Sequence, residues 1–504
     1  MERESRHYFI YMPAVLIFSI LIFQLPSIPI GDFANYFYGS KFLTEARFTL
    51  SVYDVAQFNT AVRQEGLQNF FLSYTAVPPI TAFLFMPLVW LPIYKAKIVW
   101  AIFNAILFLL IQYRLINQFK VNHWIVSILP ILFFMSLKSN IYQGQLYILI
   151  SYLYLEGILN YINNKKGIAS VLWSVTIVLK LFPVIILVFL LFKKDFKTTL
   201  SMILFCIFLI GFSIIFIDPD VWIYYLNHIL PRISAGDINN TFAINYQSMQ
   251  VLLKNLFVYD KLHNPSPYFN SPFWYYFLLS AFITLILTLL FSFSKKKQVS
   301  AIQLFAVWIL GGLVISGYGS TYGLMQYMVL IPLINGFNKK NLVLLFLLFL
   351  SIQVPSHGLN NLPFGLQFIR LYFSLILFAF FIFYDPVKLN FTYLLLMIPV
   401  YFFKNNTPIE QNYLLEKETS ILISDLRIEN NRIRYHEWNE MGRFEKDKIV
   451  RFIIYKNTDL PDTGLYSRSI HLINDSILYY LSDKGRGVGF YTIRVQTIKP
   501  HQKK

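Results

Sequence analysis

Charged residues are scarce in this sequence. Only 14% of its 504 residues are charged, whereas 56% are hydrophobic and 18% are aromatic. Soluble globular proteins carry about 25% charged residues, so this chain has too few to cover a surface that faces water. Because apolar runs recur between residues 8 and 403, lipid must cover much of that surface. The composition excludes an ordinary soluble protein and indicates an integral membrane protein.

Cysteine pairs, metal-ligand spacings and nucleotide-binding loops are also missing. The single cysteine, Cys206, lies in an apolar run and cannot form an intramolecular disulfide. The histidines and carboxylates show no metal-ligand spacing. Gly311 and Gly312 lie within an apolar run, and Gly485-Arg486-Gly487 lacks the flanking strand and helix of a phosphate-binding loop. We therefore expect no metal, no cofactor and no chemistry driven by ATP or a sugar nucleotide.

Basic residues give the chain a net charge of +17. They do not form the continuous basic face of a nucleic-acid-binding protein. They occur in short clusters between apolar runs, for example at 193–194, 295–297 and 339–340, which is typical of loops on the cytoplasmic side of a membrane. Arg3 and Arg6 precede the first run and predict a cytoplasmic N-terminus. The sequence thus predicts a multi-pass protein of the cell (inner) membrane with no nucleic-acid partner.

The apolar runs predict an all-α polytopic fold with about thirteen membrane-spanning helices. The proline-broken run at 77–92 is interpreted as re-entrant or interfacial, because the basic clusters at 114–120 and 165–166 then lie inside. If this run crosses the membrane, those two clusters lie outside. The expected spans are 8–30, 98–113, 122–137, 145–161, two short helices within 167–192, 198–217, 272–294, 300–316, 323–337, 342–354, 367–384 and 391–403.

Lys180 explains why the run at 167–192 is counted as two helices. It lies near the middle of the run and is followed by Pro183. A lysine at the centre of a bilayer costs about 2.5–3.5 kcal/mol. Two short helices that meet at Lys180 on the outer face avoid this cost and leave both flanking basic clusters inside.

Polar segments complete the predicted organisation. Residues 31–97 form a first outer loop with interfacial or re-entrant helices, and residues 218–271 form a large outer loop. After residue 403 the apolar runs stop, and short segments rich in β-branched and aromatic residues alternate with turn signals. We therefore predict a membrane domain over 1–403 and a small, β-rich soluble domain over 404–504 on the extracytoplasmic side.

Two charged residues and two polar islands are candidates for function. Asp32, directly after the first span, could be a general base for a lipid-linked substrate, or a solvated helix cap. Lys180 could bind an anion such as a lipid phosphate, or extend to the interface. The islands at 140–145 and 245–248 could hydrogen-bond sugar hydroxyls or phosphate, or be ordinary turns.

An ordered set of motifs between residues 8 and 260 consists of Asp32-Phe33 with Tyr36, the segment 74–79, Pro87-Leu88, Leu91-Pro92, Trp100, Asn104, Gly144-Gln145, Lys180 with Pro183, and Asn245 with Gln247-Ser248. In this set the chain resembles the polyprenyl-phosphate-dependent membrane glycosyltransferases of the GT-C fold. It is most similar to glycosyltransferase family 87, the α-mannosyltransferase group. Members often carry a histidine before a proline in a late span, whereas Met325 and Gln326 precede Pro332 here. The segment 404–504 is not part of the family pattern.

The resemblance implies a reaction and a set of site residues. Asp32 would be the catalytic base of an inverting transfer, and Lys180 would lie near the donor phosphate. The implied partners are a polyprenyl-phosphate sugar, a glycan or glycolipid acceptor and membrane lipids, with a hexose transferred and mannose favoured. The implied substrate-binding residues are Tyr36, Tyr74, Gln143, Gly144, Gln145, Asn245 and Gln247.

Two other functions compete with this one. A transporter or flippase of lipid-linked glycans would show paired broken helices in two related halves, and the sequence contains no such halves. A polysaccharide polymerase or ligase would also use a lipid-linked donor from the outer face.

Overall fold

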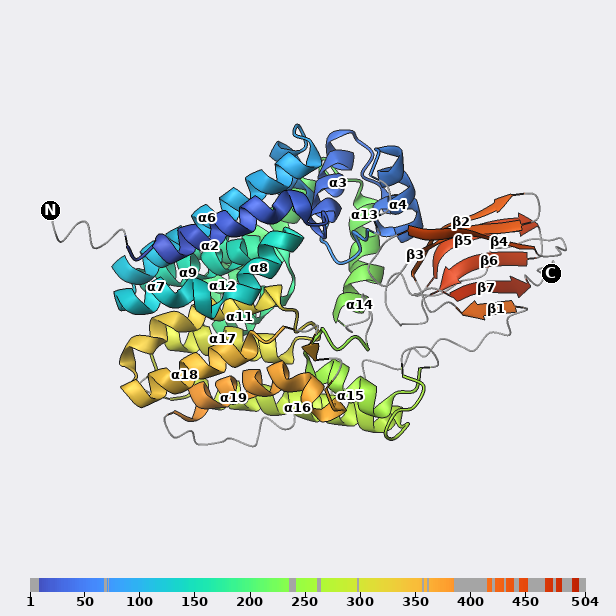
Figure 1. The fold of residues 1–504 in the computed structure, drawn as a ribbon. Coiled ribbons are helices and arrows are strands. Elements are labelled where there is room, and N and C mark those ends of the chain that lie inside the picture. The colour runs from blue at the N-terminus through green and yellow to red at the C-terminus, as the bar shows by residue number, and fades with distance from the viewer. Residues whose placement is uncertain are drawn as a thin grey trace.

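The computed structural model describes residues 9–67, 70, 72–234, 242–260, 264–296, 299–355, 358–359 and 362–384, together with seven strands between residues 415 and 497. Through residue 384 the elements that it describes are helices, in agreement with the predicted all-α class (Figure 1). From residue 12 to 192 they are α2 (Met12–Gln24), η1 (Leu25–Ser27), α3 (Phe33–Thr44), η2 (Leu50–Tyr53), α4 (Val55–Gln64), α5 (Thr81–Phe85), η3 (Met86–Leu88), α6 (Ile93–Asn117), α7 (His123–Leu132), α8 (Phe134–Gln143), α9 (Tyr147–Ile162), α10 (Lys166–Leu179), η4 (Phe182–Val184) and α11 (Ile185–Phe192).

The second half of the helical part contains both long apolar helices and short polar ones. Its elements are α12 (Phe196–Ile214), α13 (Pro219–Tyr224), the π-helical turn η5 (Tyr225–Ile229), α14 (Leu230–Ser234), α15 (Met249–Phe257), α16 (Pro272–Ser294), α17 (Ala301–Ile315), η6 (Tyr322–Gly336), α18 (Lys339–Ile352), η8 (Phe364–Phe368) and α19 (Ile369–Phe383).

Among the described residues, four helical segments are long and apolar enough to cross a membrane, namely α6, α12, α16 and η8 continued by α19. The pair α7 and α8, bent by 55°, counts as a fifth if it forms one span. The predicted membrane class is therefore supported, whereas the predicted thirteen spans are not confirmed. Several of them fold as shorter helices. The predicted span at 323–337 forms η6, a 3₁₀ helix of 15 residues, which at about 2.0 Å per residue would still reach about 30 Å.

The chain reverses direction twice between residues 166 and 214. Ser170 Oγ donates to Thr198 O at 3.4 Å and Ser174 Oγ donates to Met202 O at 3.0 Å, so α10 and α12 lie side by side and run parallel. The intervening α11 must therefore run back between their opposite ends. The apolar run at 167–192 thus folds as two short helices that meet at Lys180, as its sequence predicts.

Basic loops gather at the end of the bundle opposite Lys180. Lys166, at the start of α10, forms an ion pair of 2.7 Å with Asp195, just before α12. Asn335 Nδ2, at the far end of η6, donates to Lys120 O at 2.6 Å. The Arg114–Glu156 ion pair joins α6 to α9. Together these contacts place the loops after α6, α9, α11 and η6 at one end. The sequence predicts that this end is cytoplasmic.

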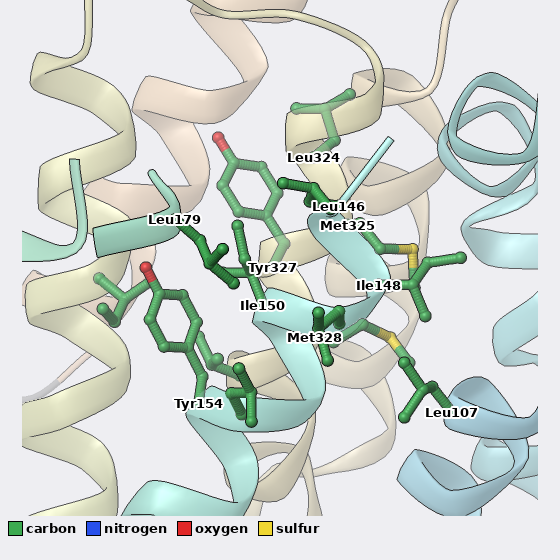
Figure 2. Close-up of a cluster of buried hydrophobic side chains, with 14 of the residues drawn as sticks. Leu107, Leu146, Ile148, Ile150, Tyr154, Leu179, Leu324, Met325, Tyr327 and Met328 are labelled. Atoms are coloured by element: carbon green, nitrogen blue, oxygen red, sulfur yellow. The ribbon is translucent and has the colours of Figure 1, made fainter. Parts of the chain in front are cut away.

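A continuous hydrophobic core joins the helices. At its centre α9 packs against η6 through aliphatic, methionine and tyrosine side chains (Figure 2). On another side of α9, Gly157 allows Trp173 of α10 to approach, because a Cβ at Gly157 would lie only 2.1 Å from Trp173 Nε1. Small residues at such positions allow helices in a membrane to pack closely.

Short helices cover the end of the bundle that carries Lys180. The predicted re-entrant segment at 77–92 forms only α5 and η3, which pack against α3. The Tyr36 and Phe85 rings stack with centroids 5.0 Å apart. Figure 1 shows α3, α4, α13 and α14 together at this end. Because α6 begins at Ile93, five residues earlier than predicted, Lys97 lies within it.

Strands occupy the C-terminal region. They are β1 (Leu415–Glu418), β2 (Leu422–Glu429), β3 (Arg432–Trp438), β4 (Phe444–Arg451), β5 (Ser467–Asn474), β6 (Ile477–Ser482) and β7 (Thr492–Thr497). They pair in an antiparallel sheet of order β1-β7-β6-β5 and a second of order β2-β3-β4. A β-rich domain that folds separately over 404–504 stays a prediction. The connections between the strands, and the predicted last span at 391–403, lie outside the described residues.

Candidate active site

Two glycine turns dock against each other at the Lys180 end of the bundle. Gly31 precedes α3 and Gly144 follows α8, and both have positive φ, +64° and +66°, a region that favours glycine. A Cβ on Gly144 would lie 2.5 Å from Phe33 Cβ, and a Cβ on Gly31 would lie 2.4 Å from Gln143 Oε1. Glycine is therefore required both for the shape of each turn and for the contact between the turns.

The docked turns hold Asp32. Its backbone N–H donates to Gln143 Oε1 at 3.3 Å, and Gln145 Nε2 donates to Asp32 Oδ2 at 2.6 Å. Gln145 Oε1 in turn accepts from the Tyr36 hydroxyl at 2.9 Å. Asp32 occupies the N-cap position of α3, but its side chain makes no capping bond, so helix capping does not explain this residue. Within the described part of the chain, its Oδ1 makes no hydrogen bond and can accept one from a substrate.

Lys180 lies in the break between α10 and η4, outside both helices. Its ammonium is 5.8 Å from the ring centroid of Tyr36 and 5.8 Å from that of Tyr147, within the range of cation–π attraction. It forms no hydrogen bond or ion pair with any residue that the structure describes. A partly buried ammonium held only by aromatic rings can still bind an anion.

Burial sets the electrostatics of this pair. It raises the pKa of the Asp32 carboxyl above its ordinary value, while Lys180, the Gln145 hydrogen bond and Lys97 act in the opposite direction. It lowers the pKa of the Lys180 ammonium to about 8, against the attraction of Asp32. A carboxylate with a raised pKa is a better proton acceptor, and a desolvated ammonium interacts strongly with an anionic ligand.

A cavity of about 130 Å³ opens beside Lys180. Its wall contains Tyr147 and Tyr322, whose rings stack at 5.2 Å, together with Ser320 and Gln326. The Gln326 side chain is 1% exposed, and its Oε1 has no hydrogen-bond partner in the part of the chain that the structure describes. Hydroxyls, an amide and an ammonium around an otherwise apolar space suit a polar, anionic headgroup. Asp32 does not line this cavity. Lys180 lies between Asp32 and the cavity, with the rings of Tyr36 and Tyr147 beside its ammonium.

Gln247 reaches the cavity wall through its backbone. Its N–H donates to Gly319 O at 3.2 Å, and Gly319 is part of the wall. Its side-chain Nε2 donates to Ile244 O at 2.6 Å and to Gln367 O at 2.8 Å. Among the described residues, Oε1 of this buried amide has no hydrogen-bond partner. Gln247 therefore supports the wall, with a single atom left for a ligand.

Tyr74 and Asn245 are not brought to the cavity. The Tyr74 ring is fully buried and packs on Gly39 of α3, where a Cβ would lie 2.2 Å from the ring. Asn245 is exposed and has no hydrogen bond within the described residues. The site thus combines Asp32 with its predicted neighbours Tyr36, Gln143, Gly144 and Gln145.

The segment 316–323 is a part of the site that the sequence analysis missed. It contributes Ser316, Tyr318, Gly319, Ser320, Tyr322 and Gly323 to the cavity wall. A signal was present, because this Gly- and Ser-rich stretch interrupts two apolar runs in the same way as 140–145. Tyr147 and Lys97 gave no such signal, since both belong to apolar helices and only the fold brings them near Asp32.

Comparison with known proteins points to one enzyme family. Residues 74–317 match the sequence model of glycosyltransferase family 87. The match supports membership of this glycosyltransferase family. The matched segment contains Gln145, Lys180 and Gln247, whereas Asp32 and Tyr36 precede it. No curated protein and no solved structure matches the chain.

Proposed function

We propose that this glycosyltransferase moves a hexose, with mannose favoured by the family resemblance, from a polyprenyl-phosphate sugar to a hydroxyl of a glycan or glycolipid. The reaction takes place on the extracytoplasmic face of the cell membrane and inverts the anomeric centre. Asp32 is the general base, and Lys180 binds the donor phosphate.

One arrangement supports this proposal: a carboxylate lies at the same end of the bundle as an ammonium that lines a cavity and has no ion-pair partner among the described residues. Gln145 and Tyr36 connect Asp32 to the aromatic rings on which Lys180 rests. Both charged groups lie opposite the loops that carry Lys166 and Lys120. A lipid-linked phosphate can enter from the surrounding bilayer at this level, where an isolated cation needs an anionic partner.

The bond changes follow from these positions. The acceptor oxygen attacks the anomeric carbon while the bond from that carbon to the phosphate oxygen breaks. The polyprenyl phosphate leaves with the bonding electron pair on its phosphate oxygen, and Lys180 stabilises the resulting negative charge. The acceptor proton passes to the Asp32 carboxylate. The products are the glycosylated acceptor and the polyprenyl phosphate, and Asp32 then returns its proton to water.

The deciding experiment compares donors. Purified protein in lipid nanodiscs is incubated with polyprenyl-phosphate mannose, polyprenyl-phosphate glucose and GDP-mannose, and sugar transfer or donor hydrolysis is measured. We expect turnover with a polyprenyl-phosphate hexose and none with the nucleotide sugar. Turnover with GDP-mannose alone would overturn the proposal. Movement of intact donor across the bilayer without any cleavage would instead support a flippase.

A further inference from the structure

Arg370 is a buried cation in α19, outside the segment that matches the family. Its side chain is 1% exposed, and none of the carboxylates that the structure describes pairs with it. Burying a guanidinium without a counter-ion is energetically costly, so its hydrogen bonds have to offset the loss of water.

The two ends of the Arg370 guanidinium hold the segment 316–323. Nη1 donates to Thr321 Oγ1 at 2.9 Å, and Nη2 donates to Gly319 O at 3.0 Å. Two bonds from one planar group to acceptors two residues apart fix both the position and the orientation of the segment. Lysine carries a single ammonium and cannot reproduce this geometry.

Other contacts show that the segment is closely fitted rather than loosely placed. Ser248 Oγ donates to Gly317 O at 2.9 Å, and the Gln247 N–H donates to Gly319 O at 3.2 Å. A Cβ on Gly319 would lie 2.1 Å from Gln247 O. Gly319 O therefore accepts from two directions, once from α19 and once from the loop before α15.

The residues held in this way face the cavity beside Lys180. Gly319 and Ser320 line its wall, and Tyr322, which also lines it, follows Thr321 directly and stacks on Tyr147. A displacement of the segment would therefore change the shape of the cavity opposite the Lys180 ammonium.

We propose that Arg370 is a positioning residue that clamps the segment 316–323 against the donor cavity. It touches no reacting atom and acts through Thr321 and Gly319. The kinetic effect of this clamp rests on the proposed function: if the donor phosphate binds in this cavity, loss of the clamp should mainly weaken donor binding. The order of the segment itself does not depend on that function.

The test measures the accessibility of the segment 316–323 and the steady-state kinetics in separate experiments. Ser320→Cys in a Cys206→Ser background gives one thiol in the cavity wall, whose reaction rate with a small maleimide reports the closure of the segment. The variants are Arg370→Gln, Arg370→Lys and Thr321→Ala, of which the last removes one of the two bonds and leaves the charge. Arg114→Gln is the matched control, because Arg114 pairs with the buried Glu156 toward the opposite end of the bundle.

We expect Arg370→Gln to raise the labelling rate about tenfold or more, since each hydrogen bond to a charged group is worth about that factor. Thr321→Ala and Arg370→Lys should give smaller increases, and Arg114→Gln none. In turnover assays of the same substitutions in the wild-type background, the donor KM should rise more than kcat falls, with the acceptor KM unchanged.

Three results would overturn the proposal. One is an unchanged labelling rate in Arg370→Gln. Another is an equal increase in Arg114→Gln, which would indicate general loosening. The third is a fall in kcat at constant donor KM. If no donor supports turnover, the labelling result still decides whether Arg370 holds the segment. If Arg370→Gln does not fold, Thr321→Ala decides the question alone.

Discussion

Gln145 donates a hydrogen bond of 2.6 Å to Asp32, although 113 residues separate the two positions in the sequence. The bond crosses the contact between two glycine turns and fixes one oxygen of the carboxylate. The other oxygen makes no bond within the described residues and can accept a proton. An oriented carboxylate of raised pKa is the arrangement that a general base requires.

Asp32→Asn should abolish sugar transfer while leaving expression and donor binding largely intact. The amide keeps the shape of the carboxylate and can still accept from Gln145, but it cannot take up the acceptor proton. General-base catalysis contributes about 10²–10⁴-fold, so initial rates with a confirmed donor should fall by that factor.

Glu45→Gln is the matched control for Asp32→Asn. Glu45 directly follows α3, is exposed and pairs with Arg47, so its loss should leave the rate unchanged. If Asp32→Asn retains most activity, the base must be sought among Glu45, Asp54 and Asp237, the last of which lies outside the described residues.

Lys180→Met should weaken donor binding as well as turnover. It removes the ammonium that faces the cavity, and a charge-assisted bond to phosphate is worth about tenfold to a hundredfold in affinity. Lys180→Arg should restore part of the affinity, because it restores the positive charge. Steady-state kinetics with varied donor concentration measure both effects. Equal donor KM values for wild type and Lys180→Met would refute this role.

The pH dependence of turnover should be bell-shaped. Transfer needs the Asp32 carboxylate without its proton, so the rate rises with pH through a pKa above the ordinary aspartate value. Donor binding needs the Lys180 ammonium with its proton, so kcat/KM falls as the pH passes about 8. In Lys180→Arg the alkaline limb should move to higher pH, because arginine does not titrate in this range. An alkaline limb that stays near pH 8 in this variant would assign it to another group.

Gly144→Ala should disrupt the site from a distance. Alanine at a φ of +66° costs about 1–2 kcal/mol, and its Cβ would push against Phe33, the residue after Asp32. We expect a lower Tm and a strongly reduced rate. Gly211→Ala is the control, since Gly211 lies in α12 and a Cβ added there would meet no described atom within 4 Å outside the backbone of its own helix. Equal losses in both variants would contradict this account of the turn.

Positions 32 and 296 should lie on opposite sides of the membrane. The basic clusters predict this arrangement. In the structure the rings of Phe192 and Phe291 have centroids 5.0 Å apart, which places the end of α16, just before position 296, at the end of the bundle that carries Lys166. Asp32→Cys and Lys296→Cys, each in the Cys206→Ser background, can be labelled with an impermeant maleimide in intact cells. Labelling of both positions from the same side would refute the predicted sidedness.

The sequence was informative wherever a residue conflicted with its surroundings. Lys180 in an apolar run, followed by Pro183, indicated a helix break because a charge inside a bilayer is costly, and the break is there. Tyr74 shows the limit of motif reasoning, because its place in the ordered motifs suggested a substrate contact, whereas its ring fills the space over Gly39. An aromatic residue in a motif can serve packing as well as binding.

The membrane class, the basic loops and the candidate pair Asp32 and Lys180 were determined by the sequence itself, because solvation of charged and apolar groups depends mainly on residue type and local order. The tertiary structure alone decided which distant groups meet. Two glycine turns bring Gln145 to Asp32, the reversal of α11 sets the Lys180 turn at the same end, and Arg370 reaches back to Gly319. These contacts join residues far apart in the sequence and depend on how the helices pack. A hydrogen bond forms only when its atoms are placed to within a few tenths of an ångström, and a local sequence pattern does not specify that placement.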